Sequence, residues 1–183
     1  MLLALGAKGI VMMSFKTYLF TAALALSVVC FVPAFVIAQD SATVLAGAEL
    51  SRVVPPGFYF QGLSAQTQMR NSAAVRFGSN RYVIAGMVDT SGYAADVRAK
   101  FEGFLITDSP ITINGSELGT GAYGFGFTDD GKMQLLDLAG NQIFSTSTTK
   151  DSALKRPRPL MMTKATDGVR LYSGRDYVTI AAR

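Results

Sequence analysis

Apolar and polar residues alternate in short runs after residue 40, and turn residues interrupt these runs about every 8 to 12 positions. Alternation with a period of two places successive side chains on opposite faces of a strand. The run 82–89, YVIAGMVD, is apolar at nearly every position, which predicts a central strand buried on both faces. The pattern predicts an all-β fold, either a single antiparallel β-sandwich or a small β-barrel of about eight strands.

The stretch 111–137 carries the clearest strand and turn signals in the chain. Its first apolar pair, at 111 and 113, is followed by Asn114-Gly115, the pair best suited to a type I′ turn with positive φ. Residues 116–118 form a short arm, and glycines 119 and 121 then mark a kink before the next strand. Asp129-Asp130-Gly131-Lys132 predicts a hairpin turn that returns the chain along 133–138. This stretch predicts an antiparallel meander.

Within this stretch, aromatic residues and glycines occupy opposite faces of one predicted strand. Tyr123, Phe125 and Phe127 point one way, while Gly124 and Gly126 point the other. Glycines at alternate strand positions predict sharp curvature or a second backbone lying close to the glycine face.

The flanking regions predict further strands of varied quality. Residues 41–54 predict a loose tail or a short helix, with a turn at 49–52. Residues 63–77 favour a strand weakly, since their Gln, Met and Ala content also permits a helix. Residues 96–106 alternate Val97, Ala99 and Phe101 with charged residues, which predicts a strand with one solvated face. Other strands are predicted at 58–60, 142–148, 160–163, 169–172 and 177–181. Residues 155–159, KRPRP, must be extended and do not fit a central strand.

The spacing around the meander carries a family resemblance. The pattern is Ile111-x-Ile113-x-Gly115-x-x-Leu118-x-x-Gly121-x-Tyr123. It resembles a signature of exported bacterial β-proteins of unknown function. The later runs RPRPL and RLYSGRDYV are also similar to small uncharacterised members of this kind. The resemblance implies a secreted β-domain and transfers no catalytic residue.

The N-terminal segment has the anatomy of a secretory signal peptide. Lys16 precedes an apolar run over 18–38, and Val36 and Ala38 supply small residues at positions −3 and −1. We therefore predict a signal peptide over 1–38, cleaved after Ala38, and a single β domain over 39–183. Met13 is an alternative start, which would make 1–12 an extension.

Two alternatives to cleavage stay open. The apolar run is long enough to span a membrane as an uncleaved anchor. Cys30 offers a lipidation site, although the residues before it lack the usual small residue. In each reading the domain is exported, to the periplasm or outside the cell, and it contacts a membrane only through the N-terminal segment.

Charge and residue types exclude several functions. Of the 17 basic residues, Lys8 and Lys16 lie in the predicted signal, which leaves 15 basic against 13 acidic residues and no case for nucleic-acid binding. The chain has no histidine, and its one cysteine, Cys30, lies in the signal. Imidazole acid–base catalysis, thiol catalysis and ordinary zinc or copper sites are therefore excluded, and no cofactor is expected.

Local motifs that resemble chemical sites have simpler explanations. Residues 119–124 match G-x-G-x-x-G, but a dinucleotide site needs a helix after the last glycine, and a strand is predicted there. Asp129 and Asp130 fit turn chemistry better than calcium binding, because few other oxygen ligands lie nearby. Ser152 with Lys155, or the carboxylates of Asp89, Asp96 and Asp108, would be the starting point for a hydrolase, yet nothing in the local sequence activates them.

The remaining functional hypotheses concern binding. We expect an exported, non-catalytic domain that acts through its surface in the cell envelope or outside the cell, with an unknown partner. A small apolar-ligand carrier with a barrel interior is the first alternative, and a carboxylate- or Ser-based hydrolase is the second. The basic segment 155–158 is interpreted as a solvated crossover loop, or else as a contact for an acidic partner or an anionic envelope surface. The candidate ligand-lining residues of a carrier are aromatic: Phe58, Phe60, Tyr82, Phe101, Tyr123, Phe125 and Phe127.

Overall fold

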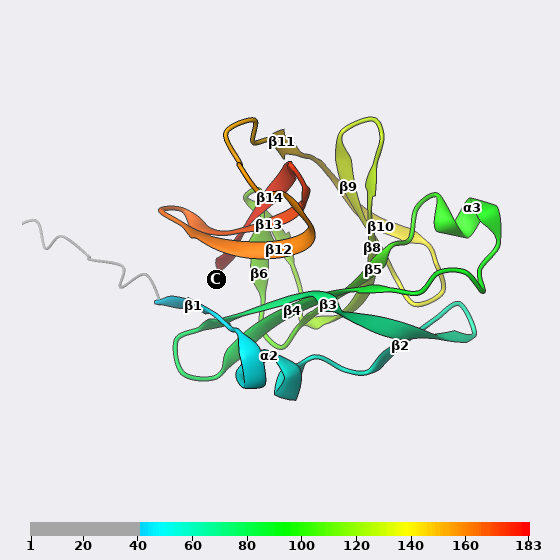
Figure 1. Ribbon diagram of the computed structural model, residues 1–183, viewed down its shortest axis with the longest axis horizontal. Coiled ribbons are helices and arrows are strands. Elements are labelled where there is room, and N and C mark those ends of the chain that lie inside the picture. The colour runs from blue at the N-terminus through cyan, green and yellow to red at the C-terminus, as the bar shows by residue number, and fades with distance from the viewer. Residues whose placement is uncertain (1–40) are drawn as a thin grey trace, which may run out of the picture. The chain divides into compact units, whose positions relative to one another are not determined.

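Two antiparallel sheets pack face to face in the computed structural model, which describes residues 41–183 (Figure 1). The all-β prediction and the sandwich are confirmed. The barrel alternative is wrong, because the strand order of neither sheet closes on itself. The count of about eight strands is too low, since the described residues alone form two sheets of eight and six strands. The predicted signal peptide over 1–38, its start at Met13 and Cys30 all lie outside the described residues.

The larger sheet has eight strands, and its edges are formed by β1 and β10. Its order is β1 (Ala42–Val44), β3 (Leu63–Phe77), β4 (Arg81–Val88), β5 (Gly103–Thr107), β8 (Gly121–Thr128), β9 (Lys132–Leu136) and β10 (Gln142–Ser147), and β2 (Gly57–Phe60) also pairs with β3. Helix α2 (Gly47–Val53) and the short helix α3 (Ala95–Arg98) lie outside the strands. The strands predicted at 58–60, 63–77, 82–89 and 142–148 are confirmed.

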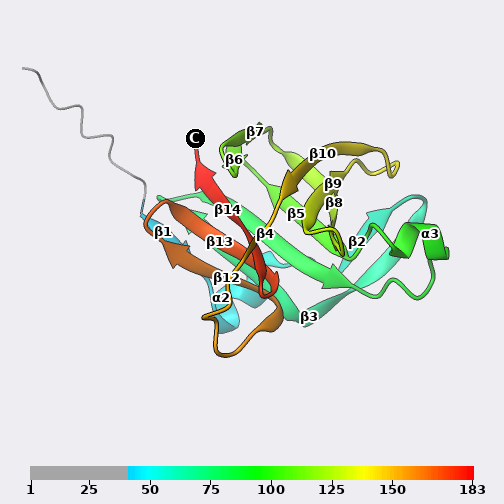
Figure 2. The same ribbon diagram turned by 90° about the horizontal axis from the view of Figure 1, so that it is seen from above.

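The smaller sheet covers one face of the larger sheet, as the view from above shows (Figure 2). Its order is β12 (Arg158–Ala165), β13 (Gly168–Gly174), β14 (Asp176–Ala182), β6 (Ile111–Ile113) and β7 (Ser116–Leu118), and β11 (Thr149–Lys150) pairs with β14. The strand β12 is an edge strand, as expected for a segment that begins next to two prolines.

The larger sheet is buried on both faces, which gives the molecule two hydrophobic cores. The first core lies between the sheets and receives Leu105 of β5, whereas the neighbouring Phe104 points into the second core on the opposite face. The second core is covered by β2, α3 and the segments beside them. Its buried members are Val54, Phe58, Phe60, Ala65, Val88, Tyr93, Val97, Phe101, Phe104 and Leu136.

The stretch 111–137 crosses from one sheet to the other. It therefore does not form the single antiparallel meander that the sequence predicted. The β6–β7 hairpin belongs to the smaller sheet, and the chain enters the larger sheet at Gly121. The turn chemistry is confirmed, because Asn114 and Gly115 have φ values of 48° and 81° and Gly131 has φ of 74°. The predicted close approach on the glycine face is also confirmed, since the backbone of Lys100 lies directly against Gly126.

One local prediction is wrong, and of the two alternatives for residues 41–54 the short helix is confirmed. Residues 96–102 form helix α3 and the segment after it, and the strand β5 begins only at Gly103. The cause is the spacing of Val97 and Phe101, which are buried together on one side of a helical turn, while Ala99 is exposed. Residues 41–54 are more ordered than a tail, since β1 pairs with β3 and α2 includes the predicted turn at 49–52.

Candidate functional site: a groove between the sheet edges

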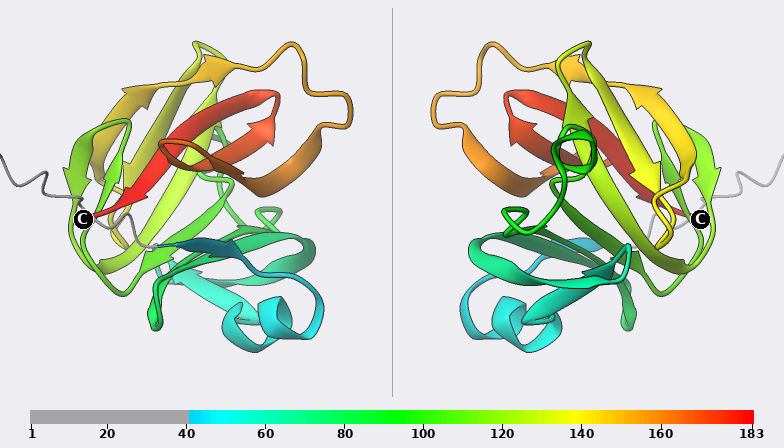
Figure 3. Two further views of the ribbon diagram at one scale, coloured as in Figure 1. Left: turned by 90° about the vertical axis from the view of Figure 1, so that its left-hand side faces the viewer. Right: turned by 90° about the vertical axis from the view of Figure 1, so that its right-hand side faces the viewer.

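An open groove of about 270 Å³ lies where β1 and α2 meet β3 and β12. Seen from the β1 side, β12 lies above β1 and α2 (Figure 3, left). The groove therefore lies along the open side of the sandwich, between an edge strand of each sheet. Its lining residues are Val44, Leu45, Ala46, Gly47, Leu50, Met69, Arg70, Ser72, Ala73, Arg158, Leu160, Met161 and Met162.

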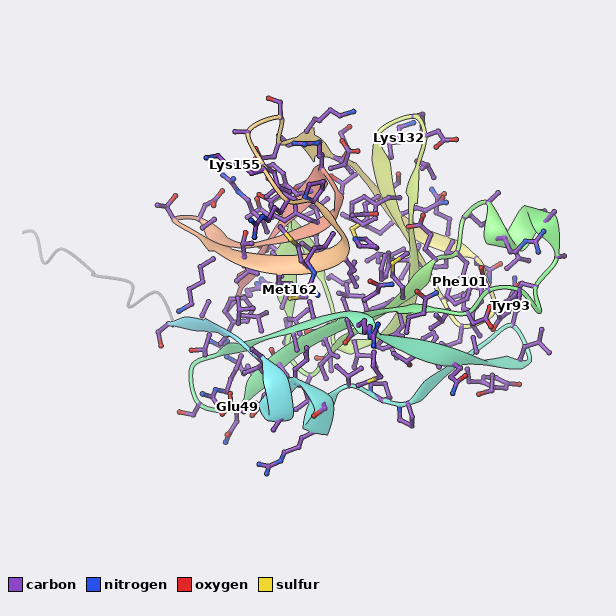
Figure 4. All side chains as sticks on the ribbon, in the orientation of Figure 1. Glu49, Tyr93, Phe101, Lys132, Lys155 and Met162 are labelled. Carbon is purple, nitrogen blue, oxygen red and sulfur yellow. The ribbon has the colours of Figure 1, made fainter. Side chains whose placement is uncertain are left out.

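The floor of the groove is apolar and the rim carries methionines. Leu45, Leu160 and Met162 are buried, and the last two belong to the first hydrophobic core. Met162 is labelled in Figure 4 near this side of the molecule. Met69 is 41% exposed at the rim, and Met161 is half-buried. Unbranched thioether side chains adapt their shape to different apolar surfaces, so this lining suits a flexible recognition surface.

A large bulge in β3 delivers Met69 and Arg70 to the groove. Thr67 pairs with Val88 and Ser72 with Gly86, so residues 68–71 lie opposite Met87 alone. Side chains hold the bulge in place: Asn71 Nδ2 donates to Gln68 Oε1 at 2.8 Å, and Ser72 Oγ donates to the Met69 carbonyl at 2.7 Å. Bulges of this kind redirect side chains out of the regular ladder.

Strand β12 has an irregularity on the facing wall. Arg158 pairs with Gly174 and Met161 with Tyr172, so Pro159 and Leu160 lie opposite Ser173 alone. The strand pairs with β13 on one side, and no described strand pairs with its other edge. The groove is thus bordered by an unpaired strand edge as well as by apolar side chains.

The groove is positively charged at one end. Arg158 Nη2 donates to the Arg70 carbonyl at 3.4 Å, which brings the two arginines to the same part of the rim. The ion pairs found in residues 41–183 are Lys132 with Asp130 at 2.6 Å and Arg183 with Glu117 at 2.7 Å, so neither groove arginine has a carboxylate partner there. Both guanidinium groups are therefore available to an anionic ligand.

The basic segment 155–158 leads into this rim. Asp151 fixes the loop before it, since its Oδ1 accepts the backbone N–H of Ala153 at 3.0 Å and its Oδ2 accepts the Tyr172 hydroxyl at 3.0 Å. Lys155 and Arg156 are exposed beyond this anchor. The loop therefore presents two further exposed cations shortly before Arg158 in the chain.

The seven aromatic residues predicted to line a ligand site lie elsewhere. Phe58, Phe60 and Phe101 are buried in the second core, and Tyr93 and Phe101 are labelled there in Figure 4. Phe125 is buried in the first core, Tyr123 and Phe127 pack against it, and Tyr82 is half-buried on β4. None of the seven lines the groove. The groove residues that sequence reasoning missed have weak local signals: the uncertain strand character of 63–77 and the RPRP run.

Two of the aspartates flagged in the sequence, Asp130 and Asp89, serve turns. Asp130 Oδ2 accepts from Lys132 Nζ at 2.6 Å, and this hydrogen bond lowers the pKa of Asp130. Asp89 caps its turn by accepting the Ser91 N–H, which lowers the pKa of Asp89. Gly124 continues a strand, so no helix N-terminus faces the glycines at 119–124. Across residues 41–183 no group of three or more Asp, Glu, Cys or His side chains is placed to hold a metal ion.

Glu102, among residues 41–183, is an acidic residue whose pKa is raised. Burial raises the pKa of its carboxyl group, and the hydrogen bond from the Phe127 N–H to Glu102 Oε2, 3.1 Å long, acts in the opposite direction. Its backbone also bonds to both neighbouring strands, through Phe125 and Val88. Glu102 therefore joins strands β4, β5 and β8 where β5 begins.

Comparison with known proteins gives no relative. No protein-family model, curated protein or solved structure matches this chain. Within the described residues, no helix has the length and apolar character needed to cross a membrane. The groove combines an apolar lining, two arginines and an unpaired strand edge.

Proposed function

We propose that this protein is an exported, non-catalytic binding domain that holds an extended apolar segment of a protein partner, with the segment's carboxylate beside Arg70 and Arg158. The observation that carries the proposal is the pair of arginines without carboxylate partners at the end of an apolar groove. An extended segment can also add its backbone to the unpaired edge of β12, the mode known as β-augmentation.

A protein segment suits this groove better than a small apolar ligand carried inside the fold. Leu105 and Phe125 belong to the core between the sheets, and both are fully buried. The groove is open along one side, which leaves room for a chain that continues beyond it. The alternative of an apolar-ligand carrier would instead be supported by an enclosed cavity lined by the aromatic residues.

A binding role also fits the chemistry of the residues better than hydrolysis. Ser152 is exposed on a loop, and its carbonyl oxygen accepts a hydrogen bond from Arg175. The aspartates at 89, 130 and 137 each stabilise their own turn. A hydrolase needs a nucleophile within hydrogen-bond reach of a base, and the carboxylates of these three aspartates already bond within their own turns.

The proposal is tested with two short fluorescent peptides of leucine and valine, amidated at the C-terminus. One ends in glutamate and the other in glutamine, so that they differ in one charge. Fluorescence anisotropy measures their affinity for protein purified from cells that express the full chain. We expect the glutamate peptide to bind about three- to ten-fold more tightly, as a charge-assisted contact at a partly exposed rim provides. The advantage should disappear when Arg70→Gln and Arg158→Gln are combined.

Matched variants separate this role from a general charge effect. Arg98→Gln removes an exposed arginine from α3, at the other end of the molecule (Figure 1), and should leave both affinities unchanged. Met161→Asp places a carboxylate in the groove and should abolish binding of both peptides. Binding of neither peptide to the unaltered protein contradicts the proposal. If dodecanoate, kept below its critical micelle concentration, displaces the bound peptide at a lower concentration than unlabelled peptide does, the result supports the carrier instead.

Export is tested separately by intact-mass analysis of the protein recovered from the cell envelope or the medium. A mass that begins at Gln39 supports the proposed signal peptide. A chain that still begins at Met1 or Met13 contradicts cleavage.

A further inference from the structure

Methionines are concentrated in the groove. Residues 41–183 contain five methionines, at 69, 87, 133, 161 and 162, and the groove is lined by Met69, Met161 and Met162. The same residues contain no cysteine and no histidine, and the whole chain has no tryptophan. Thiols and thioethers are the side chains that peroxides oxidise most readily. In the described part of the chain, oxidation is therefore directed to the thioethers, and most of these lie at one place.

The methionines differ in their access to solvent, and oxidation of a thioether follows its exposure. Met69 is 41% exposed and Met161 is half-buried, whereas Met162 is 6% exposed and Met133 is completely buried. Met87 is half-buried, packs against the first core and does not line the groove. Among the groove methionines, a small oxidant in water therefore reaches Met69 and Met161 and is kept from Met162.

The two accessible thioethers lie on facing walls of the groove. Met69 belongs to the bulge of β3 over 68–71, and Ser72 Oγ holds it by donating to the Met69 carbonyl at 2.7 Å. Met161 directly follows the irregularity of β12 at Pro159 and Leu160. Two separate departures from regular strand pairing thus bring methionines from distant parts of the chain to one apolar surface.

Oxidation would change what this surface can bind. A sulfoxide is polar, and its oxygen is a hydrogen-bond acceptor that the thioether lacked. Arg70 and Arg158 line the same groove and have no carboxylate partner in residues 41–183. A guanidinium group donates readily to such an oxygen. A sulfoxide at Met69 or Met161 therefore removes apolar surface and also competes for the arginines.

We propose that Met69 and Met161 form a reversible oxidation site, at which a peroxide converts the thioethers to sulfoxides and so releases the protein segment from the groove. In each step the sulfur lone pair attacks a peroxide oxygen and the O–O bond breaks. Hydrogen peroxide leaves as water, and the sulfur is oxidised by two electrons. Methionine sulfoxide reductases, one for each sulfoxide epimer, restore the thioether. The release rests on the proposed function of the groove, whereas the order of oxidation does not.

The oxidation site is tested with dilute hydrogen peroxide on protein purified from cells that express the full chain. Proteolysis and fragment-ion mass spectrometry follow each methionine over time and separate the neighbours Met161 and Met162. Met69 and Met161 should be oxidised at least about ten-fold faster than Met133 and Met162, because the latter two are buried. If Met133 or Met162 is oxidised as fast as the two accessible methionines, the inference is overturned.

The release is tested with the fluorescent glutamate peptide described above. Oxidation of both methionines should weaken its binding by about ten-fold, and treatment with the two reductases should restore it. The double variant Met69→Leu with Met161→Leu conserves side-chain volume, so it should bind the peptide and lose its sensitivity to peroxide. Met87→Leu is the matched control, since it removes a thioether outside the groove and should leave the sensitivity unchanged.

A further variant needs no oxidant. Met69→Gln places an uncharged polar side chain of similar length at the rim and should weaken peptide binding without peroxide. If affinity is unchanged after Met69 and Met161 are fully oxidised, the inference is overturned and the proposed function stands. If the untreated protein binds no peptide, the proposed function fails and the release fails with it, while the order of oxidation still decides whether the two methionines are a modification site.

Discussion

The rings of Phe60 and Phe101 stack with their centroids 3.9 Å apart and an interplanar angle of 14°. Phe60 comes from β2 and Phe101 from the segment after α3, and both rings lie against Gly124 of β8. The glycine face of β8 is therefore the surface on which the second core packs. A side chain at 124 would occupy space that the stacked rings fill.

Gly124→Ala should destabilise the fold by about 1–3 kcal/mol, the usual cost of overpacking a filled core. A Cβ at 124 would lie 2.7 Å from a ring carbon of Phe60, whose side chain is fully buried and stacked on Phe101. Gly92→Ala is the control, because a Cβ there has no neighbour within 4 Å. Urea unfolding followed by circular dichroism measures both. Equal stability of the two variants would show that the second core is loosely packed.

Tyr93→Phe should lower the free energy of unfolding by about 1 kcal/mol. The Tyr93 hydroxyl lies 3.1 Å from the Phe60 carbonyl and 3.2 Å from the Leu63 carbonyl, and it joins the α3 segment to the β2–β3 hairpin. Tyr82→Phe is the matched control, since Tyr82 is half-buried on β4 and lies outside this cluster. A loss of the same size in both variants would contradict a specific role for the Tyr93 hydroxyl.

Glu102→Gln should stabilise the protein at neutral pH and have little effect in acid. Burial raises the pKa of Glu102 in the folded state, so the folded protein holds this proton to a higher pH than the unfolded chain does. The stability associated with this group is fully present below the unfolded-state pKa, about 4.3, and is lost as the pH rises through the folded-state pKa. The difference between the variant and the unaltered protein should therefore grow from about pH 4 to pH 7. Urea midpoints across this range measure it, and a constant difference would contradict the assignment.

Turn chemistry and burial patterns were readable from the sequence where they depend on neighbouring residues. Asn114-Gly115 and Gly131 adopt the predicted positive φ values, because these residue types tolerate that conformation at least cost. Residues 82–89 form a central strand because both faces of β4 meet a core. Spacing was ambiguous at Val97 and Phe101, since residues four apart share a face in both a strand and a helical turn.

The groove could not be predicted, because it is assembled from segments far apart in the chain. Arg70 reaches it through a bulge whose register depends on β4, and Arg158 through an irregularity opposite β13. Neither register is specified by the local pattern of apolar residues. The aromatic residues attracted attention as ligand-lining candidates, yet large rings such as Phe60 and Phe125 fill the two cores.

Asn114 joins the two sheets at the side of the sandwich opposite the groove. Its Oδ1 accepts the Thr179 N–H of β14 at 2.8 Å, and its Nδ2 donates to the Ser147 carbonyl of β10 at 2.9 Å. The same residue also supplies a positive φ of 48° at the β6–β7 turn. Two substitutions separate these contributions.

Asn114→Gly keeps the backbone conformation accessible and removes the side-chain hydrogen bonds, so it should cost about 1–2 kcal/mol for bonds that are partly exposed. Asn114→Ala loses the same bonds and also places an alanine in the left-handed region, which adds about 1 kcal/mol. Chemical denaturation of both variants measures the contribution of the side-chain hydrogen bonds and that of the backbone conformation at position 114. If the glycine variant is as stable as the unaltered protein, the link from Asn114 to Thr179 and Ser147 contributes nothing, and the sheets are held together by the first core alone.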